Sequence, residues 1–235
     1  MPRSLLASLP WLVAVLVACA PLRGSAPDAE APAVSPLPSD EYHRLASRHE
    51  PVLRIDPARS LVVIEVRRAG SLAELGHDHV VASRAVEGFI APRAGRADAV
   101  VALATLEVDE PSLRRAAGMD TQPSAADAVG TRRNMLGPVL EAERYPFASV
   151  AVRSSAFDSG QRFLPVALTL HGVARTIDVL VSIDVQDSVA TVSGAFAVAQ
   201  TDFGIPPFSL LGGAIAVRDR VDVRFRLVAV LQGPE

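Results

Sequence analysis

The sequence contains no lysine. All 23 basic residues are arginine, and 26 acidic residues outnumber them. Without lysine there can be no Schiff-base chemistry and no lysine to hold a nucleotide phosphate, as in a P-loop. The formal net charge of −3 also lacks the basic footprint that nucleic-acid binders need. We therefore expect no nucleic-acid partner.

Cysteine and aromatic residues are also scarce. The single cysteine, Cys19, excludes an internal disulfide and a cysteine-rich zinc site. Aromatic residues make up 5% of a chain that is 49% hydrophobic, so the core must be built from Val, Leu, Ile and Ala with a few Phe. Neither a Gly-x-Ser-x-Gly elbow nor a glycine-rich phosphate loop is present. We therefore predict that the protein is not an enzyme and has no catalytic residues.

The N-terminal region has the pattern of an export signal. Residues 1–18 carry Arg3 and then an apolar run that is too short to span a bilayer as a helix. The Leu-Val-Ala-Cys sequence that ends at Cys19 resembles the lipobox of bacterial lipoproteins, in which the cysteine becomes the first mature residue and is acylated. This resemblance implies a membrane anchor through Cys19 and a location in the periplasm or cell envelope. The alternative is an ordinary cleaved signal with an incidental cysteine.

A segment rich in proline and alanine follows the signal. Residues 19–50 contain five prolines among Ala, Ser and acidic residues, with few periodic apolar positions. This composition predicts a disordered tether, in which residues 40–49 have the option of a short helix. The folded domain is predicted to span residues 51–235, a length that suits one β domain.

Beyond residue 51, apolar and polar residues alternate with a period of two in many short segments. This alternation predicts eight to ten antiparallel strands, and therefore a sandwich or an up-and-down barrel. Residues 109–143 interrupt the pattern and predict a lid-like excursion with a helix over 132–142. Strands are expected at residues 52–56, 61–68, 84–90, 99–108, 149–157, 163–170, 176–184, 190–200 and 218–231.

The predicted inner face is aliphatic. A barrel of about eight strands either fills its interior with side chains or leaves room for one small ligand. Since Val and Ala fill space less completely than Phe or Trp, the pattern favours an apolar cavity that accepts a hydrocarbon chain, with a packed core as the alternative. The side chains predicted to line this lipid cavity are Ile64, Val66, Phe89, Val101, Val150, Val152, Leu168, Leu170, Val179, Val181, Phe196, Val223 and Phe225.

Three histidines are candidate metal ligands. His77 and His79 are two residues apart, so in an extended segment both rings point to one face, as a metal-binding pair requires. His171 or Asp78 would supply a third ligand, and a metal-dependent hydrolase is the enzymatic hypothesis built on this set. The alternative is that these histidines hydrogen-bond neighbouring carboxylates or backbone groups. We expect no cofactor other than a bound lipid.

Several sequence blocks resemble the YceI-like family, whose members are lipocalin-like barrels that bind polyisoprenoid lipids. The specific blocks are Leu-Thr-Leu-His-Gly-Val-Ala-Arg at 168–175 and Thr-Asp-Phe-Gly-Ile at 201–205. Weaker matches lie at residues 54–56, 76–79, 86–89, 131–132, 142–149 and 217–221.

The resemblance implies an all-β fold, an extended antiparallel eight-stranded barrel with a short helical excursion. It also implies a non-catalytic role in binding, sequestering or transporting a long-chain isoprenoid lipid. A structural or stress-related envelope protein is the alternative, with a packed barrel that docks a partner through an exposed loop at residues 203–208. Association of two barrels into a homodimer stays open.

Overall fold

The computed structural model describes residues 35–233. The predicted signal peptide, Cys19 and most of the predicted tether lie outside these residues. No helix between residues 35 and 233 is long and apolar enough to cross a bilayer.

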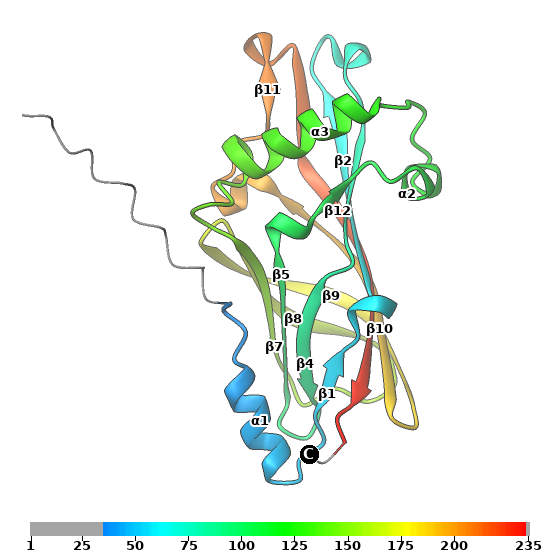
Figure 1. Ribbon diagram of the computed structural model, residues 1–235, viewed down its shortest axis with the longest axis vertical. Helices are drawn as coiled ribbons and strands as arrows, with labels where there is room; N and C mark the ends of the chain where they lie inside the picture. Colours follow the sequence, from blue (N-terminus) through cyan, green and yellow to red (C-terminus); the bar gives the residue numbers. More distant parts are fainter. Residues whose placement is uncertain (1–34, 234–235) are drawn as a thin grey trace, which may run out of the picture. The chain divides into compact units, whose positions relative to one another are not determined.

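The described part of the chain is mostly β-structure with a few helices (Figure 1). The strands are β1 (Leu53–Ile55), β2 (Leu61–Ala69), β3 (His79–Ser83), β4 (Val86–Ala91), β5 (Arg96–Ala102), β6 (Glu107–Val108), β7 (Phe147–Arg153), β8 (Gly160–Leu170), β9 (Val173–Gln186), β10 (Val189–Ala199), β11 (Ser209–Leu210) and β12 (Ile215–Leu231). The helices are α1 (Ser39–Ser47), α2 (Pro111–Ala116) and α3 (Ala125–Asn134), and the short helical turns are η1 (Pro57–Arg59), η2 (Ala73–Leu75), η3 (Leu103–Thr105), η4 (Met135–Val139), η5 (Gln200–Phe203) and η6 (Leu211–Gly213).

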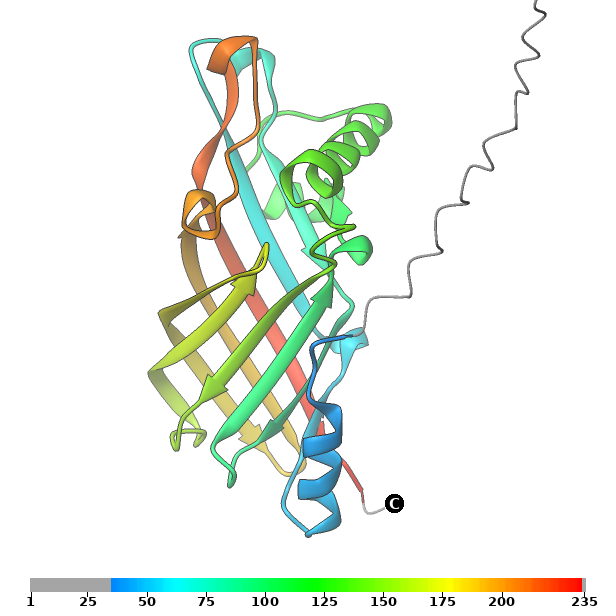
Figure 2. The same ribbon diagram turned by 90° about the vertical axis from the view of Figure 1, so that its left-hand side faces the viewer.

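The strands form a closed antiparallel barrel (Figures 1 and 2). β12 closes it, because one edge pairs with β10 and the other pairs with β1 and β2 in succession. β1 with β2, β3 with β4, and β5 with β6 each act as one interrupted strand, since β4 pairs with β1 and β5 while β3 pairs with β2 and β6. The wall therefore has eight antiparallel strands, and the fold predicted from the sequence is confirmed.

A serine supports β12 at the interruption between β1 and β2. The Ser60 hydroxyl accepts a hydrogen bond from the Val228 N–H at 3.0 Å, and the Asp56 N–H donates to the Val228 carbonyl at 2.8 Å. These contacts satisfy the β12 backbone where η1 leaves the wall. β12 thus stays continuous across the break.

The helical part of the excursion overlaps the helix predicted over 132–142 but has other limits, since α3 and η4 together span residues 125–139. α3 begins earlier because Ser124 and Asp127 form a capping box, in which each side chain accepts a hydrogen bond from the other residue's backbone N–H. Pro138 then lies within η4, a single wider turn. α2 was not predicted, and it begins with Pro111 at its first position.

The predicted tether is also too long, because α1 lies within residues 19–50 and packs on the barrel. The Tyr42 ring stacks on Phe89 with 5.0 Å between centroids. Its hydroxyl donates to the Asp98 carboxylate at 2.7 Å, and Arg96 bonds Glu41 of the same helix. These partners are remote in sequence, so local composition could not reveal them. The folded part therefore begins before residue 51.

We predict that Tyr42→Phe weakens the attachment of α1. Burial by itself raises the pKa of Asp98, but hydrogen bonds from Arg153, Tyr42 and Arg96 hold that pKa below its usual value. Loss of one buried donor to this carboxylate should lower the free energy of unfolding by about 1–2 kcal/mol. Urea denaturation measures the change.

The control is Tyr145→Phe, which alters the other tyrosine of the chain. Within residues 35–233 the Tyr145 hydroxyl makes no hydrogen bond to a protein group, so its loss should change stability by less than about 0.5 kcal/mol. Equal effects of the two substitutions would contradict the role assigned to the Tyr42 hydroxyl.

Candidate functional site

A cavity of about 370 Å³ lies inside the barrel. Inward side chains of β1, β2, β4, β5, β7, β8, β9, β10 and β12 line it, together with residues of η4. Near β1, the cavity lining includes the packed side chains of Leu53, Ile90 and Ala190. The strands thus present a continuous aliphatic surface to the interior.

Three lining residues have polar side chains, and each already has a partner. The Asp98 carboxylate binds Tyr42 on the outer face, the Ser83 hydroxyl accepts from the Ala85 N–H, and the Gln200 amide donates to a backbone carbonyl. The wall therefore offers a ligand apolar contact and few free hydrogen-bonding groups.

All thirteen residues predicted as lipid contacts border this cavity. Phe89 differs from the rest, because its ring packs outside the wall with Tyr42, Val52 and Ala91. Its opposite neighbour in the register, Asp98, also bonds outwards to Tyr42. The two-residue period at β4 therefore places Phe89 on the face that α1 covers. Lipid contact by the other twelve side chains stays a prediction.

One end of the cavity is covered by the excursion. Met135, Val139 and Leu140 line the cavity and pack against two clusters of buried side chains, one around Leu103 of η3 and one around Val198 and Val221 of the wall. Sequence reasoning did not assign these three side chains to the site. Their signal was a short apolar run inside an otherwise polar segment, without the period that would have shown which way it faces.

A gap in the wall is filled by the loop at residues 200–205. β9 and β10 pair only up to Val181 opposite Gly194, although both strands continue beyond that point. Phe203 and Ile205, each 1% exposed, pack with wall residues there. The expectation that residues 203–208 form an exposed docking loop is therefore wrong for these two side chains, because they complete the core.

The candidate metal ligands do not assemble. The rings of His77 and His79 have centroids 6.3 Å apart, and His79 Nδ1 lies 2.7 Å from an Asp109 carboxylate oxygen. His171 Nε2 instead lies 3.4 Å from a Glu141 carboxylate oxygen. Between residues 35 and 233, no group of three or more His, Cys, Asp or Glu side chains could hold a metal ion.

Comparison with known families identifies the barrel. The model of the YceI-like domain matches residues 53–229, which is most of the chain. The chain belongs to the YceI-like family. Among curated proteins, none matches the sequence.

Two solved structures are similar to this YceI-like domain. A polyisoprenoid binding domain from Saccharophagus degradans implicated in plant cell wall breakdown has a TM-score of 0.56 at 16% identity, and the match covers 77% of this chain and 98% of that one. BcnA of Burkholderia cenocepacia has a TM-score of 0.52 at 17% identity, and the match covers 75% and 99% of the two chains. At these identities the likeness shows a shared fold.

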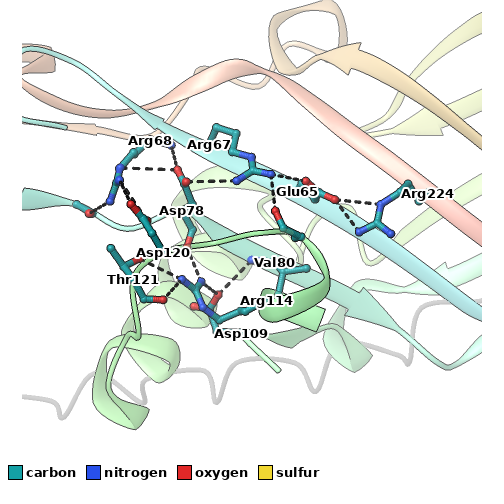
Figure 3. Close-up of polar contacts among 12 residues, drawn as sticks. Glu65, Arg67, Arg68, Asp78, Val80, Asp109, Arg114, Asp120, Thr121 and Arg224 are labelled. Atoms are coloured by element: carbon teal, nitrogen blue, oxygen red, sulfur yellow. Dashed lines mark hydrogen bonds and ion pairs between the residues drawn. The ribbon is translucent and has the colours of Figure 1, made fainter. Parts of the chain in front are cut away.

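A buried ion pair attaches the excursion of this YceI-like domain to its wall (Figure 3). Arg114 of α2 is 2% exposed and donates to Asp109 at 2.6 Å and to the Thr121 carbonyl at 2.6 Å. Asp109 also accepts from the Val80 N–H of β3 at 3.1 Å. The segment that leads to α3 and η4 is therefore attached to β3 by charge, while η4 itself is attached by apolar contact.

We predict that Asp109→Asn destabilises the YceI-like domain by about 3–5 kcal/mol at pH 7, because Arg114 stays buried without its counter-charge. Burial raises the pKa of Asp109, but His79, the Val80 N–H and Arg114 together hold it below its usual value. The stabilisation is therefore present above the unfolded pKa of about 3.9 and is lost as the pH falls through the lower folded value.

Urea denaturation of the wild type and of Asp109→Asn, from pH 7 down to pH 2, measures this effect. The difference between their free energies of unfolding should shrink below about pH 4. Asp120→Asn is the control, because Asp120 pairs with Arg68 at 3.2 Å but its side chain is 69% exposed. It should cost less than about 1 kcal/mol. If the stability difference between the wild type and Asp109→Asn stayed constant with pH, it would contradict the role assigned to the Asp109 charge.

Proposed function

We propose that this protein binds a polyisoprenoid or similar long-chain lipid in its barrel cavity and sequesters or transports it without covalent chemistry. The observation that carries the proposal is the aliphatic cavity of about 370 Å³ inside the barrel. Its volume lies within the range of known small-molecule pockets, about 300–1,000 Å³. A polar ligand would lose its hydrogen bonds to water without replacement there, whereas a hydrocarbon chain would not.

The energetics favour the same class of ligand. Each CH₂ group that leaves water for the cavity contributes about 0.8 kcal/mol, so a long chain binds without a charged anchor. The Saccharophagus degradans domain with the same fold is named for polyisoprenoid binding. That name supports an isoprenoid as the first lipid to test.

The two alternative functions have less support. A purely structural barrel would gain stability from a filled interior, since empty apolar volume forfeits contacts between side chains. The metal-dependent hydrolase needs His77, His79 and His171 around one ion. In the described part of the chain, His79 instead lies against Asp109, and His171 lies near Glu141.

The proposal includes a place for the protein. We propose that Cys19 is acylated and anchors the barrel to a membrane in the bacterial envelope, facing the periplasm. The support is the lipobox-like sequence before Cys19. Mass spectrometry of the N-terminal peptide of the mature protein tests this point independently of ligand binding.

We predict that organic extracts of the purified protein contain a long-chain isoprenoid lipid, and that Leu168→Trp lowers its amount several-fold. Leu168 lines the cavity on β8, so a larger ring should occupy space that the ligand needs. Mass spectrometry of lipid extracted per mole of protein measures the change.

The matched control is Leu180→Trp on the adjacent strand. Leu180 is 45% exposed, and it alternates with the inward Val179 and Val181. Its replacement should leave the lipid content unchanged. Lipid-free wild-type protein that also takes up no isoprenoid from vesicles would refute the proposal.

A further inference from the structure

We propose that Leu72, Leu75, Leu210 and Leu211 form a leucine tip that inserts into a lipid bilayer. The tip is made by two neighbouring loops, one after the end of β2 and one before the start of β12, which project beyond the barrel wall at the top of Figures 1 and 2. The inference rests on the proposed function, because a bilayer is where a long-chain lipid would be taken up or released.

The tip gathers much of the apolar surface that the described residues expose. Leu72 is 42% exposed, Leu75 69%, Leu210 51% and Leu211 73%. Other large exposed apolar side chains, such as Phe163 and Leu180, lie on the outer wall. Single exposed leucines are ordinary, but four on adjacent loops mark an interaction site.

The two loops are held against each other by their backbones. The Leu72 N–H donates to the Ala214 carbonyl at 2.8 Å, and β11 pairs with β12 with Leu210 opposite Ile215. Gly70 allows this approach, since it has φ +94° and a Cβ there would lie 2.3 Å from the Ala214 oxygen. The leucines of both loops therefore lie on one projection and stay exposed to solvent.

The backbone at Leu211 supports the same conclusion. Leu211 has φ 51°, in the left-handed region that disfavours a leucine, and its side chain is 73% exposed. Neither local conformation nor burial within residues 35–233 stabilises a leucine at this position. An apolar contact with a lipid bilayer would account for a leucine at this position.

The charges of the tip point to a bilayer. Between residues 70 and 76, and between 208 and 216, Glu74 is the only charged side chain. A convex tip with almost no charge can enter a deformable apolar medium, whereas a protein partner would need a matching groove. Because no arginine lies in these segments, binding should depend little on anionic lipid or on salt.

The test places a tryptophan at the tip and measures how deeply it enters a bilayer. Each protein carries Trp11→Phe, so that any precursor that keeps the predicted signal has no other tryptophan, together with Leu211→Trp in one protein and Leu75→Trp in a second. Each is mixed with phosphatidylcholine vesicles that contain brominated acyl chains, which quench tryptophan on contact. We expect the fluorescence of both probes to fall at least twofold, equally at low and high salt.

The matched control is Leu180→Trp in the same background, at an exposed site on the wall. An acyl anchor at Cys19 would bring all three proteins to the vesicles, so only insertion of the tip separates the probes. Circular dichroism verifies that each variant is folded. Equal quenching at all three positions, or no quenching at positions 75 and 211, would overturn the proposal.

A second measurement separates this inference from the function on which it rests. The double substitution Leu75→Ser and Leu211→Ser should slow the transfer of isoprenoid lipid between vesicles about tenfold. The amount of lipid held per mole of protein should stay the same. Lipid in the cavity with an unquenched tip would refute the tip alone. A protein without lipid and unable to take it up would refute the proposed function.

Discussion

Backbone hydrogen bonding along both edges of β12 is the constraint on which the barrel depends. One edge pairs with β10 from Val189 opposite Val230 to Ala199 opposite Arg220, and the other pairs with β1 and β2. An open sheet would leave two unpaired edges for other chains to join. Closure removes them, and it turns every second side chain of the wall toward one shared interior.

The closed wall also explains how the interior retains space. The backbone pairing of eight strands sets its circumference, and the short aliphatic side chains inside do not fill the interior, so a cavity of about 370 Å³ remains. Gly194 shows the same effect locally, because a Cβ there would lie 2.8 Å from the Phe225 ring. That ring can therefore lie against the wall, and the lumen beside it stays available to a ligand.

The buried polar networks lie outside the interior of the barrel. The Asp98 carboxylate holds α1 on the outer face, and the pair of Asp109 and Arg114 holds the start of the excursion against β3. Both networks are buried and hydrogen-bonded, as charges away from water must be. The interior can then remain apolar, while η4 covers one end through side chains such as Met135 and Val139.

The two-residue alternation predicted antiparallel strands in a sandwich or a barrel, and the resemblance to the YceI-like family favoured the barrel. All thirteen side chains predicted from the alternation border the cavity. The strands predicted at 163–170 and 176–184 form a hairpin, in which His171 and Gly172 have positive φ in a two-residue turn between β8 and β9. Strand ends were predicted less well, and β12 begins at Ile215 where residue 218 was expected. Bulges and twist in a wall shift such limits without changing the alternation.

By itself, the sequence determined which side chains can share an apolar face, because that depends only on the strand period of two. The tertiary structure decided which residues that are far apart in the sequence come into contact. The Phe89 ring was predicted to face the cavity, but it packs against Tyr42 and supports α1. Phe203 and Ile205 belong to the core because they fill the gap between β9 and β10. Such contacts depend on partners far away in the chain, and no local pattern encodes where those partners lie.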